Sequence, residues 1–149
     1  MKIQQLSLFA ENRPGSLRKP CKILADAGID LLSLTVADTE EFGILRMIVS
    51  DPKRAQQVLS DAGVVVKTTE VVAIQVPQKP GGLLVVLDAL DAANQSIEYM
   101  YAFAGMCAGR QKSSEAVLVF RFSNPDAAIA ALAKAGIPAI APAQLLQPK

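Results

Sequence analysis

The stretch ENRPGSL, residues 11–17, lies where an apolar run ends and a helical pattern begins. PQKPGGL, residues 77–83, likewise lies between an apolar run and a helical pattern. Proline fixes φ and glycine permits a left-handed backbone, so the pair is typical of a tight turn between a strand and a helix. A turn that occurs twice predicts that one structural unit is repeated.

The alignment of the two halves extends well beyond this turn. GIDLLSLTVA (28–37) matches NQSIEYMYAF (94–103) without a gap, and GILRMIVSDP (43–52) matches AVLVFRFSNP (116–125). Between these matches the second half carries extra residues around 104–114, where a loop between two strands tolerates insertion. A shared order of motifs with one insertion indicates an internal duplication.

Each half is predicted to form strand, helix, strand, strand, helix, strand. In the first half we expect Ser16 to cap the first helix and Gly28 to end it. Asp51 followed by Pro52 is a strong start for the second helix, which we expect to end at Gly63. Asn124-Pro125 repeats that start in the second half.

Two βαββαβ units predict an α+β fold with two antiparallel sheets, each with its helices on one face, which is the ferredoxin-like arrangement. The run VVVKTTEVVAIQV (64–76) is long for one strand. We expect it to hold the last strand of the first repeat and the first strand of the second, with a bend near Thr69-Glu70. The predicted domains are therefore residues 1–69 and 70–149.

Two strands carry alternating patterns that predict their faces. In 31–37 we expect Leu32, Leu34 and Val36 to face the core. In 97–103 one face carries a run of large side chains: Ile97, Tyr99, Tyr101 and Phe103. If register is kept between the repeats, this face is the one without helices, and Glu98 points toward the helices. The alternative is a shifted register, in which these residues belong to the core.

Composition excludes several classes of function. The chain of 149 residues is 51% hydrophobic and 19% charged, with a formal net charge of +1, so no strong field attracts it to nucleic acid or to anionic membranes. Gln4 and Gln5 interrupt any signal-peptide core, and no apolar stretch is long enough to span a membrane, so we expect a cytoplasmic protein. Cys21 and Cys107 show no metal spacing and are expected to be reduced.

Histidine is absent, which removes the commonest general base and a common metal ligand. The sequence also lacks a phosphate-binding glycine loop with a lysine. We therefore expect no catalytic residues, no metal and no cofactor.

The repeated turn can also bind a ligand. Backbone N–H groups after the glycine open a helix, and with the helix dipole they favour a carboxylate. The side-chain amide of Asn12 offers a carbonyl that can accept from an ammonium group. Together these groups suit a free α-amino acid. The plainer interpretation is that Pro-Gly only marks a turn.

ENRPGSL, LADAGIDLLSLTVAD and EFGILRMIVSDPKRAQQVLSDAG resemble an ACT domain, and KPGGLLVVLDAL, IEYMYAFA and AVLVFRFSNPDAAIAALAKAG resemble a second one. The resemblance covers nearly the whole chain and is greatest to stand-alone tandem ACT proteins of bacteria. It implies a regulatory module that binds an amino acid near the first strand–helix loop, at an interface between domains. It also implies side-by-side assembly, so we expect a homodimer.

The resemblance also implies which residues bind the ligand. In the first repeat they are Asn12, Arg13, Pro14, Gly15, Ser16 and Leu17 of the loop, with Asp30, Leu31 and Leu32 at the start of the next strand. In the second repeat they are Gln78, Lys79, Pro80, Gly81, Gly82 and Leu83, with Ser96, Ile97 and Glu98. The second loop departs from the pattern at Gln78 and Gly82, so the first loop is the stronger candidate.

The predicted function is a non-catalytic sensor of a free amino acid. The alternative is a regulatory small subunit of an amino-acid biosynthetic enzyme, similar to that of acetolactate synthase. Those subunits begin with a similar ACT domain, but their second half is not an evident second copy, as it is here. An enzyme in its own right has the least support from the sequence.

Overall fold

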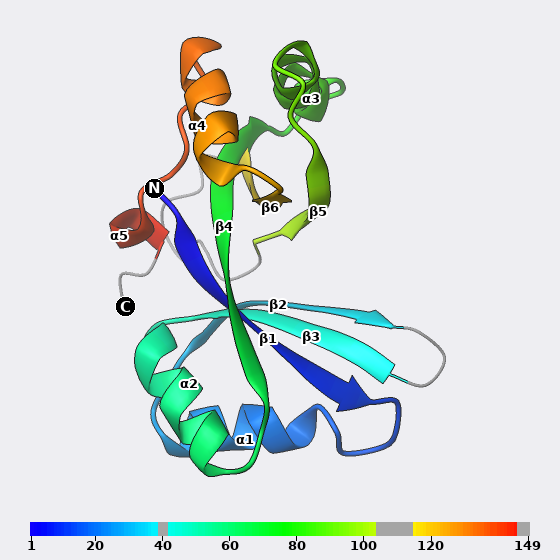
Figure 1. The fold of residues 1–149 in the computed structure, drawn as a ribbon, viewed down its shortest axis with the longest axis vertical. Coiled ribbons are helices and arrows are strands. Elements are labelled where there is room, and N and C mark those ends of the chain that lie inside the picture. Colours follow the sequence, from blue (N-terminus) through cyan, green and yellow to red (C-terminus); the bar gives the residue numbers. More distant parts are fainter. Residues whose placement is uncertain (39–41, 104–114, 146–149) are drawn as a thin grey trace. The chain divides into compact units, whose positions relative to one another are not determined.

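The computed structural model describes residues 1–38, 42–103 and 115–145 (Figure 1). The described chain falls into two compact units. The first unit is Gln4–Thr69, and the second unit combines Met1–Ile3 with Glu70–Leu145. The predicted insertion at 104–114 and Cys107 lie outside the described residues.

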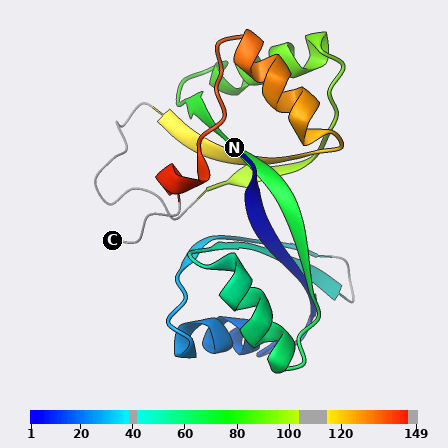
Figure 2. The ribbon, with the colours of Figure 1, turned by 60° about the vertical axis from the view of Figure 1, so that its left-hand side comes forward.

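The first unit has the predicted βαββαβ order, in which the last strand is the start of β4. Its elements are β1 (Ile3–Glu11), α1 (Arg18–Asp26), β2 (Leu31–Asp38), β3 (Phe42–Val49), α2 (Pro52–Asp61) and the start of β4 (Val66–Pro77). The strands are ordered β2-β3-β1-β4, and β3 pairs antiparallel with both β1 and β2. Helices α1 and α2 lie together against one face of these strands (Figures 1 and 2). The core between helices and sheet consists of Leu6, Leu8, Leu24, Ile29, Leu45, Met47, Val49, Ala55 and Leu59.

The ends of these helices follow the sequence signals at three of four places. Asp51 caps α2, because its carboxylate accepts from the Arg54 N–H at 3.0 Å. Gly28 and Gly63 have φ of +67° and +74° and end their helices as predicted. The Ser16 cap was wrong: α1 begins only at Arg18, after Leu17 in the cap position, with no side-chain cap.

The predicted core face of β2 is confirmed in direction for Leu34 and Val36, but not in burial. The register shifts between Leu31 and Ser33, and Leu31, not Leu32, pairs with the core residue Val49. Leu34 pairs with Met47 and Val36 with Leu45, so they share the face of two core residues. They nevertheless remain 44% and 42% exposed. The reason is that β2 is an edge strand, with β3 beside it and no further described strand on its other side.

The second unit repeats the pattern with two differences. It contains the rest of β4, α3 (Gly82–Ala92), β5 (Ile97–Ala102), β6 (Glu115–Phe122), α4 (Pro125–Lys134) and α5 (Pro142–Leu145), with strands ordered β4-β6-β5. The two strands predicted within 64–76 form one continuous strand, β4. The predicted last strand of the repeat is reduced to a single bridge between Ile74 and Ala139, followed by α5. The chain has the α+β fold of two tandem ferredoxin-like units, as predicted.

A β-bulge decides the faces of β5. The register shifts between Ile97 and Tyr99, so that Ile97 and Met100 both pack against the helix-side core. Tyr99 pairs with Arg121, which alternates with the core residues Phe120 and Phe122 and therefore lies on the opposite face. Tyr99 and Tyr101 thus lie on the face without helices, while placing Ile97 with them was wrong.

The predicted direction of Glu98 was also wrong. Its carboxylate accepts from Arg121 Nε at 3.3 Å. Because Arg121 lies on the face without helices, Glu98 is drawn toward that face by the bulge. This ion pair gives the Glu98 carboxylate a charged partner.

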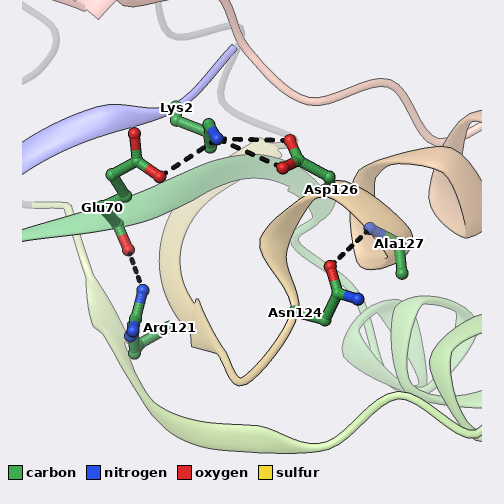
Figure 3. A network of polar contacts seen from close by, with 6 residues as sticks. All are labelled: Lys2, Glu70, Arg121, Asn124, Asp126 and Ala127. Atoms are coloured by element: carbon green, nitrogen blue, oxygen red, sulfur yellow. Dashed lines mark hydrogen bonds and ion pairs between the residues drawn. The ribbon is translucent and has the colours of Figure 1, made fainter.

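An ion-pair network joins the first residues of the chain to the second unit (Figure 3). Lys2 Nζ lies 3.0 Å from Glu70 Oε2 and 3.3 Å from Asp126 Oδ1, and Arg121 Nη1 donates to the Glu70 carbonyl at 2.9 Å. The hydrogen bonds with Glu70 and Asp126 raise the pKa of Lys2 above its ordinary value of 10.5. Residues 1–3 therefore pack with residues 70–145, and a domain boundary after residue 69 stays a prediction.

Candidate functional site

A cleft of about 640 Å³ lies in the first unit, where β1 ends and α1 begins. Its walls come from three segments, of which the first two are neighbours in sequence and the third is distant. They are Leu8–Glu11 at the end of β1, residues 13–16 with Lys19 and Pro20 at the start of α1, and Gly63–Val65 between α2 and β4. The cleft is therefore built around the first Pro-Gly turn.

The turn supplies backbone donors beside this cleft. Gly15 has φ of +88°, a left-handed conformation that favours glycine. Ser16 N–H donates to the Arg13 carbonyl and Lys19 N–H to the Gly15 carbonyl. Among the described residues, the N–H groups of Gly15, Leu17 and Arg18 have no acceptor. Free N–H groups at the N-terminus of a helix attract an anion.

Three charged side chains line the cleft. Arg13 Nε and Glu11 Oε2 form an ion pair of 2.6 Å, in which both side chains are more than half exposed. Lys19 is exposed, in the first turn of α1. The lining thus carries two cations and one anion, next to the positive end of a helix dipole.

The cleft brings together part of the predicted set. Arg13, Pro14, Gly15 and Ser16 line it, whereas Asn12 and Leu17 belong to the same turn without lining it. The predicted residues at the start of β2 are also absent from its walls: Asp30, Leu31 and Leu32. Asp30 N–H instead donates to Ser50 Oγ at 3.0 Å. The binding role of all these residues stays a prediction.

Some lining residues were missed by the sequence reasoning. Glu11 lies three residues before Pro14, and Lys19 lies four residues after Gly15. Their charge and their closeness to the Pro-Gly pair are the signal that the sequence offers for them. Gly63, Val64 and Val65 carried no such signal, because they follow α2 and approach the turn only in the folded chain.

The whole chain can be compared with known proteins. The family model for the ACT domain pair matches residues 1–147. The chain belongs to the ACT domain pair family. No curated protein matches this ACT pair.

Solved structures share the fold of the ACT pair. Protein BT0572 from Bacteroides thetaiotaomicron is 39% identical, with a TM-score of 0.89, and the match covers 99% of this chain and 98% of that one. The regulatory subunit of aspartate kinase from Thermus thermophilus is 14% identical, with a TM-score of 0.60 and coverage of 89% and 91%. Aspartate kinase from Synechocystis is 20% identical, with a TM-score of 0.57, and covers 93% of this chain but only 26% of the enzyme.

The second ACT repeat arranges its loop differently. Gly81, with φ of +79°, is the cap of α3, and Gly82 N–H donates to the Lys79 carbonyl at 2.9 Å. Gly82 is buried, and a Cβ built there would overlap the Pro77 carbonyl oxygen. The remaining predicted loop residues split between exposed positions and the core: Gln78, Lys79 and Pro80 are exposed, and Leu83 packs against the core.

The predicted residues at the start of β5 do not share one setting either. Ser96 is exposed, Ile97 packs against the core and Glu98 pairs with Arg121.

Within the described chain there is no group of three or more potential metal ligands. No helix of residues 1–38, 42–103 or 115–145 is long and apolar enough to cross a membrane.

Proposed function

We propose that this ACT pair is a non-catalytic regulatory sensor that binds a free α-amino acid in the cleft of the first unit. The observation that carries the proposal is the meeting of free backbone N–H groups, a carboxylate and two cations around one cleft. An α-amino acid carries one carboxylate and one ammonium group close together, and this lining offers a partner for each.

The ligand carboxylate is proposed to bind at the N-terminal end of α1. The unpaired N–H groups of Gly15, Leu17 and Arg18 are the donors for it. The ammonium is proposed to bind Glu11, because this carboxylate lines the cleft and Asn12 does not. Val64 and Val65 offer an apolar wall for the ligand side chain.

A regulatory subunit of an amino-acid biosynthetic enzyme is the second candidate. The Thermus thermophilus chain is described as the regulatory subunit of aspartate kinase, and its length matches that of this ACT pair. A protein of this fold and size thus serves as an enzyme subunit in that organism. Co-purification of an enzyme with the tagged ACT pair from its own host would favour this role.

The location and assembly of the protein are proposed from the sequence. The small net charge of +1 and the regulatory family agree with a cytoplasmic protein. A homodimer is proposed because β2 is an edge strand among the described residues, and an edge strand can pair with a strand of another copy.

A thermal-shift screen against the twenty amino acids at millimolar concentration tests the sensor. A ligand at about a hundred times its Kd adds about 2.7 kcal/mol of stability, which is a shift of about 5–10 °C. Gly15→Val should abolish the shift by straining the turn and by placing a side chain beside its N–H groups. Gly136→Val is the matched control, because Gly136 also has a positive φ, of +75°, with open space around it, but lies in the second unit.

A flat screen would contradict the proposed function. So would a ligand whose shift survives in Gly15→Val, since that ligand would be bound elsewhere in the chain.

A further inference from the structure

We propose that Lys19 makes the cleft selective for amino acids with an acidic side chain. The inference rests on the proposed function and adds the chemical class of the ligand. The charged side chains that line the cleft are Glu11, Arg13 and Lys19, and of these Glu11 and Arg13 pair with each other.

The ion pair between Glu11 and Arg13 matches the charges of one amino-acid backbone. Without ligand, the two side chains satisfy each other at 2.6 Å. When a zwitterion binds, its ammonium pairs with Glu11. Its carboxylate pairs with Arg13 and accepts hydrogen bonds from the nearby N–H groups. The pair is exposed, so separating the two side chains costs little. Binding therefore exchanges one ion pair for two and leaves no charge of this pair without a partner.

Lys19 remains as the surplus charge. Among the described residues it has no acidic partner, whereas Lys22, one turn later on the same helix, is paired with Asp26 at 2.7 Å. The lining contains no carboxylate besides Glu11. Glu11 pairs with Arg13 in the free protein and with the ammonium group when the ligand is bound. The cleft thus lacks one negative charge, and a ligand with a second carboxylate supplies it.

The rest of the lining is consistent with a short acidic side chain. Aspartate and glutamate carry one or two methylene groups before the carboxylate, and Pro20, Val64 and Val65 give these groups an apolar wall. A cationic side chain would instead meet Lys19 and the positive end of α1, which disfavours it. The expected order is acidic ligands first, neutral ligands next and cationic ligands last.

Titration calorimetry with two isosteric pairs of ligands tests this order. The probes are L-glutamate against L-glutamine, and L-aspartate against L-asparagine, with L-leucine and L-lysine for comparison. In the intact chain the acidic member of at least one pair should bind about threefold to tenfold more tightly than its amide, the range expected for a partly exposed ion pair. Low ionic strength should widen the preference, because salt screens exposed charges.

Lys19→Met should reduce this preference to about one while neutral ligands keep their affinity. Lys22→Met is the matched control: it removes a lysine from the same helix outside the cleft and should leave the preference intact. Both side chains are at least partly exposed, so both variants are expected to fold, which circular dichroism checks.

The outcomes separate this inference from the proposed function. If leucine or an amide binds at least as tightly as the acids, or if Lys19→Met keeps the preference for acids, selection by Lys19 is wrong and the sensor stands. If none of the twenty amino acids binds, both the selection and the sensor are overturned.

Discussion

Gly15 and Gly82 lie in the Pro-Gly loops of the two repeats, Gly82 at the place that Ser16 holds in the first, and they serve different purposes. Gly15 has a left-handed backbone with open space where a Cβ would lie. Gly82 has no such φ value, but the Pro77 carbonyl oxygen occupies the space of its missing side chain. The first glycine is thus required by conformation and the second by close packing.

Alanine at these two positions should therefore have different costs. Gly15→Ala is expected to cost about 1–2 kcal/mol, the penalty of a left-handed conformation for a residue with a Cβ. Gly82→Ala is expected to cost about 3 kcal/mol, because the loop must move to relieve the overlap. Urea unfolding of both variants checks the order. Equal costs would mean that the second loop relaxes easily.

The three charged residues of the cleft differ in how well the sequence predicts them. Arg13 was found from the sequence because it lies within the turn motif. Glu11 and Lys19 flank that motif, and no local rule says which of the neighbouring charges faces a cleft. Asn12 shows the reverse case: its chemistry suits an ammonium group, yet it does not line the cleft.

Among the elements, the second helix of each repeat is the one best specified by its own residues. Asp51 and Asn124 precede a proline, and each side chain accepts from the N–H three residues later, at 3.0 Å and 3.1 Å. This geometry depends only on residues next to one another in the chain. It was therefore predicted correctly in both halves.

Removal of either cap should destabilise the protein by about 1 kcal/mol. Asp51→Ala and Asn124→Ala test this in denaturant titrations. The exchanges Asp51→Asn and Asn124→Asp are the controls, because both side chains cap helices about equally well. An exchange as costly as alanine would show that the side chain acts through something other than capping.

Strand faces are less well specified than helix ends. The alternating patterns of β2 and β5 are clear in the sequence, yet the bulge at Ile97 places both Ile97 and Glu98 on faces other than the predicted ones. A bulge arises from the pairing with β6, so it depends on a partner strand that is distant in sequence. The half-exposure of Leu34 and Val36 depends in the same way on β2 being an edge strand.

On the scale of the whole molecule, the first three residues belong to the unit formed by the second half of the chain. Ile3 is 1% exposed, and Lys2 pairs with Glu70 and Asp126. The strands β1 and β4 both run from one compact unit into the other. The sequence repeat thus does not coincide fully with the compact units.

The Lys2 network should stabilise the protein in a pH-dependent way. The folded state raises the pKa of Lys2, mainly through its hydrogen bonds to Glu70 and then Asp126. This stabilisation is fully present below the unfolded pKa of about 10.5 and is lost as the pH rises through the higher folded value. The difference in unfolding free energy between the native chain and Lys2→Met should therefore be constant from about pH 7 to 10 and shrink above that.

Lys53→Met is the control for this measurement. Lys53 is exposed in the first unit, and no acidic partner is found for it among the described residues. Its substitution should give a difference that does not change in the same window. A Lys2→Met difference that stayed constant beyond pH 11 would mean that the ion pairs contribute nothing measurable.

The sequence by itself determined the duplication, the order of elements in the first repeat, the starts of both second helices and the family. These features rest on capping, periodicity and turn chemistry, which act over a few neighbouring residues. Only the tertiary structure decided that Val66–Pro77 is one strand, that the last strand is reduced to a bridge, and that Gly63–Val65 joins the Pro-Gly turn in forming a cleft. Each of these depends on contacts between segments far apart in the chain, and a local pattern carries no information about which distant segment will be its neighbour.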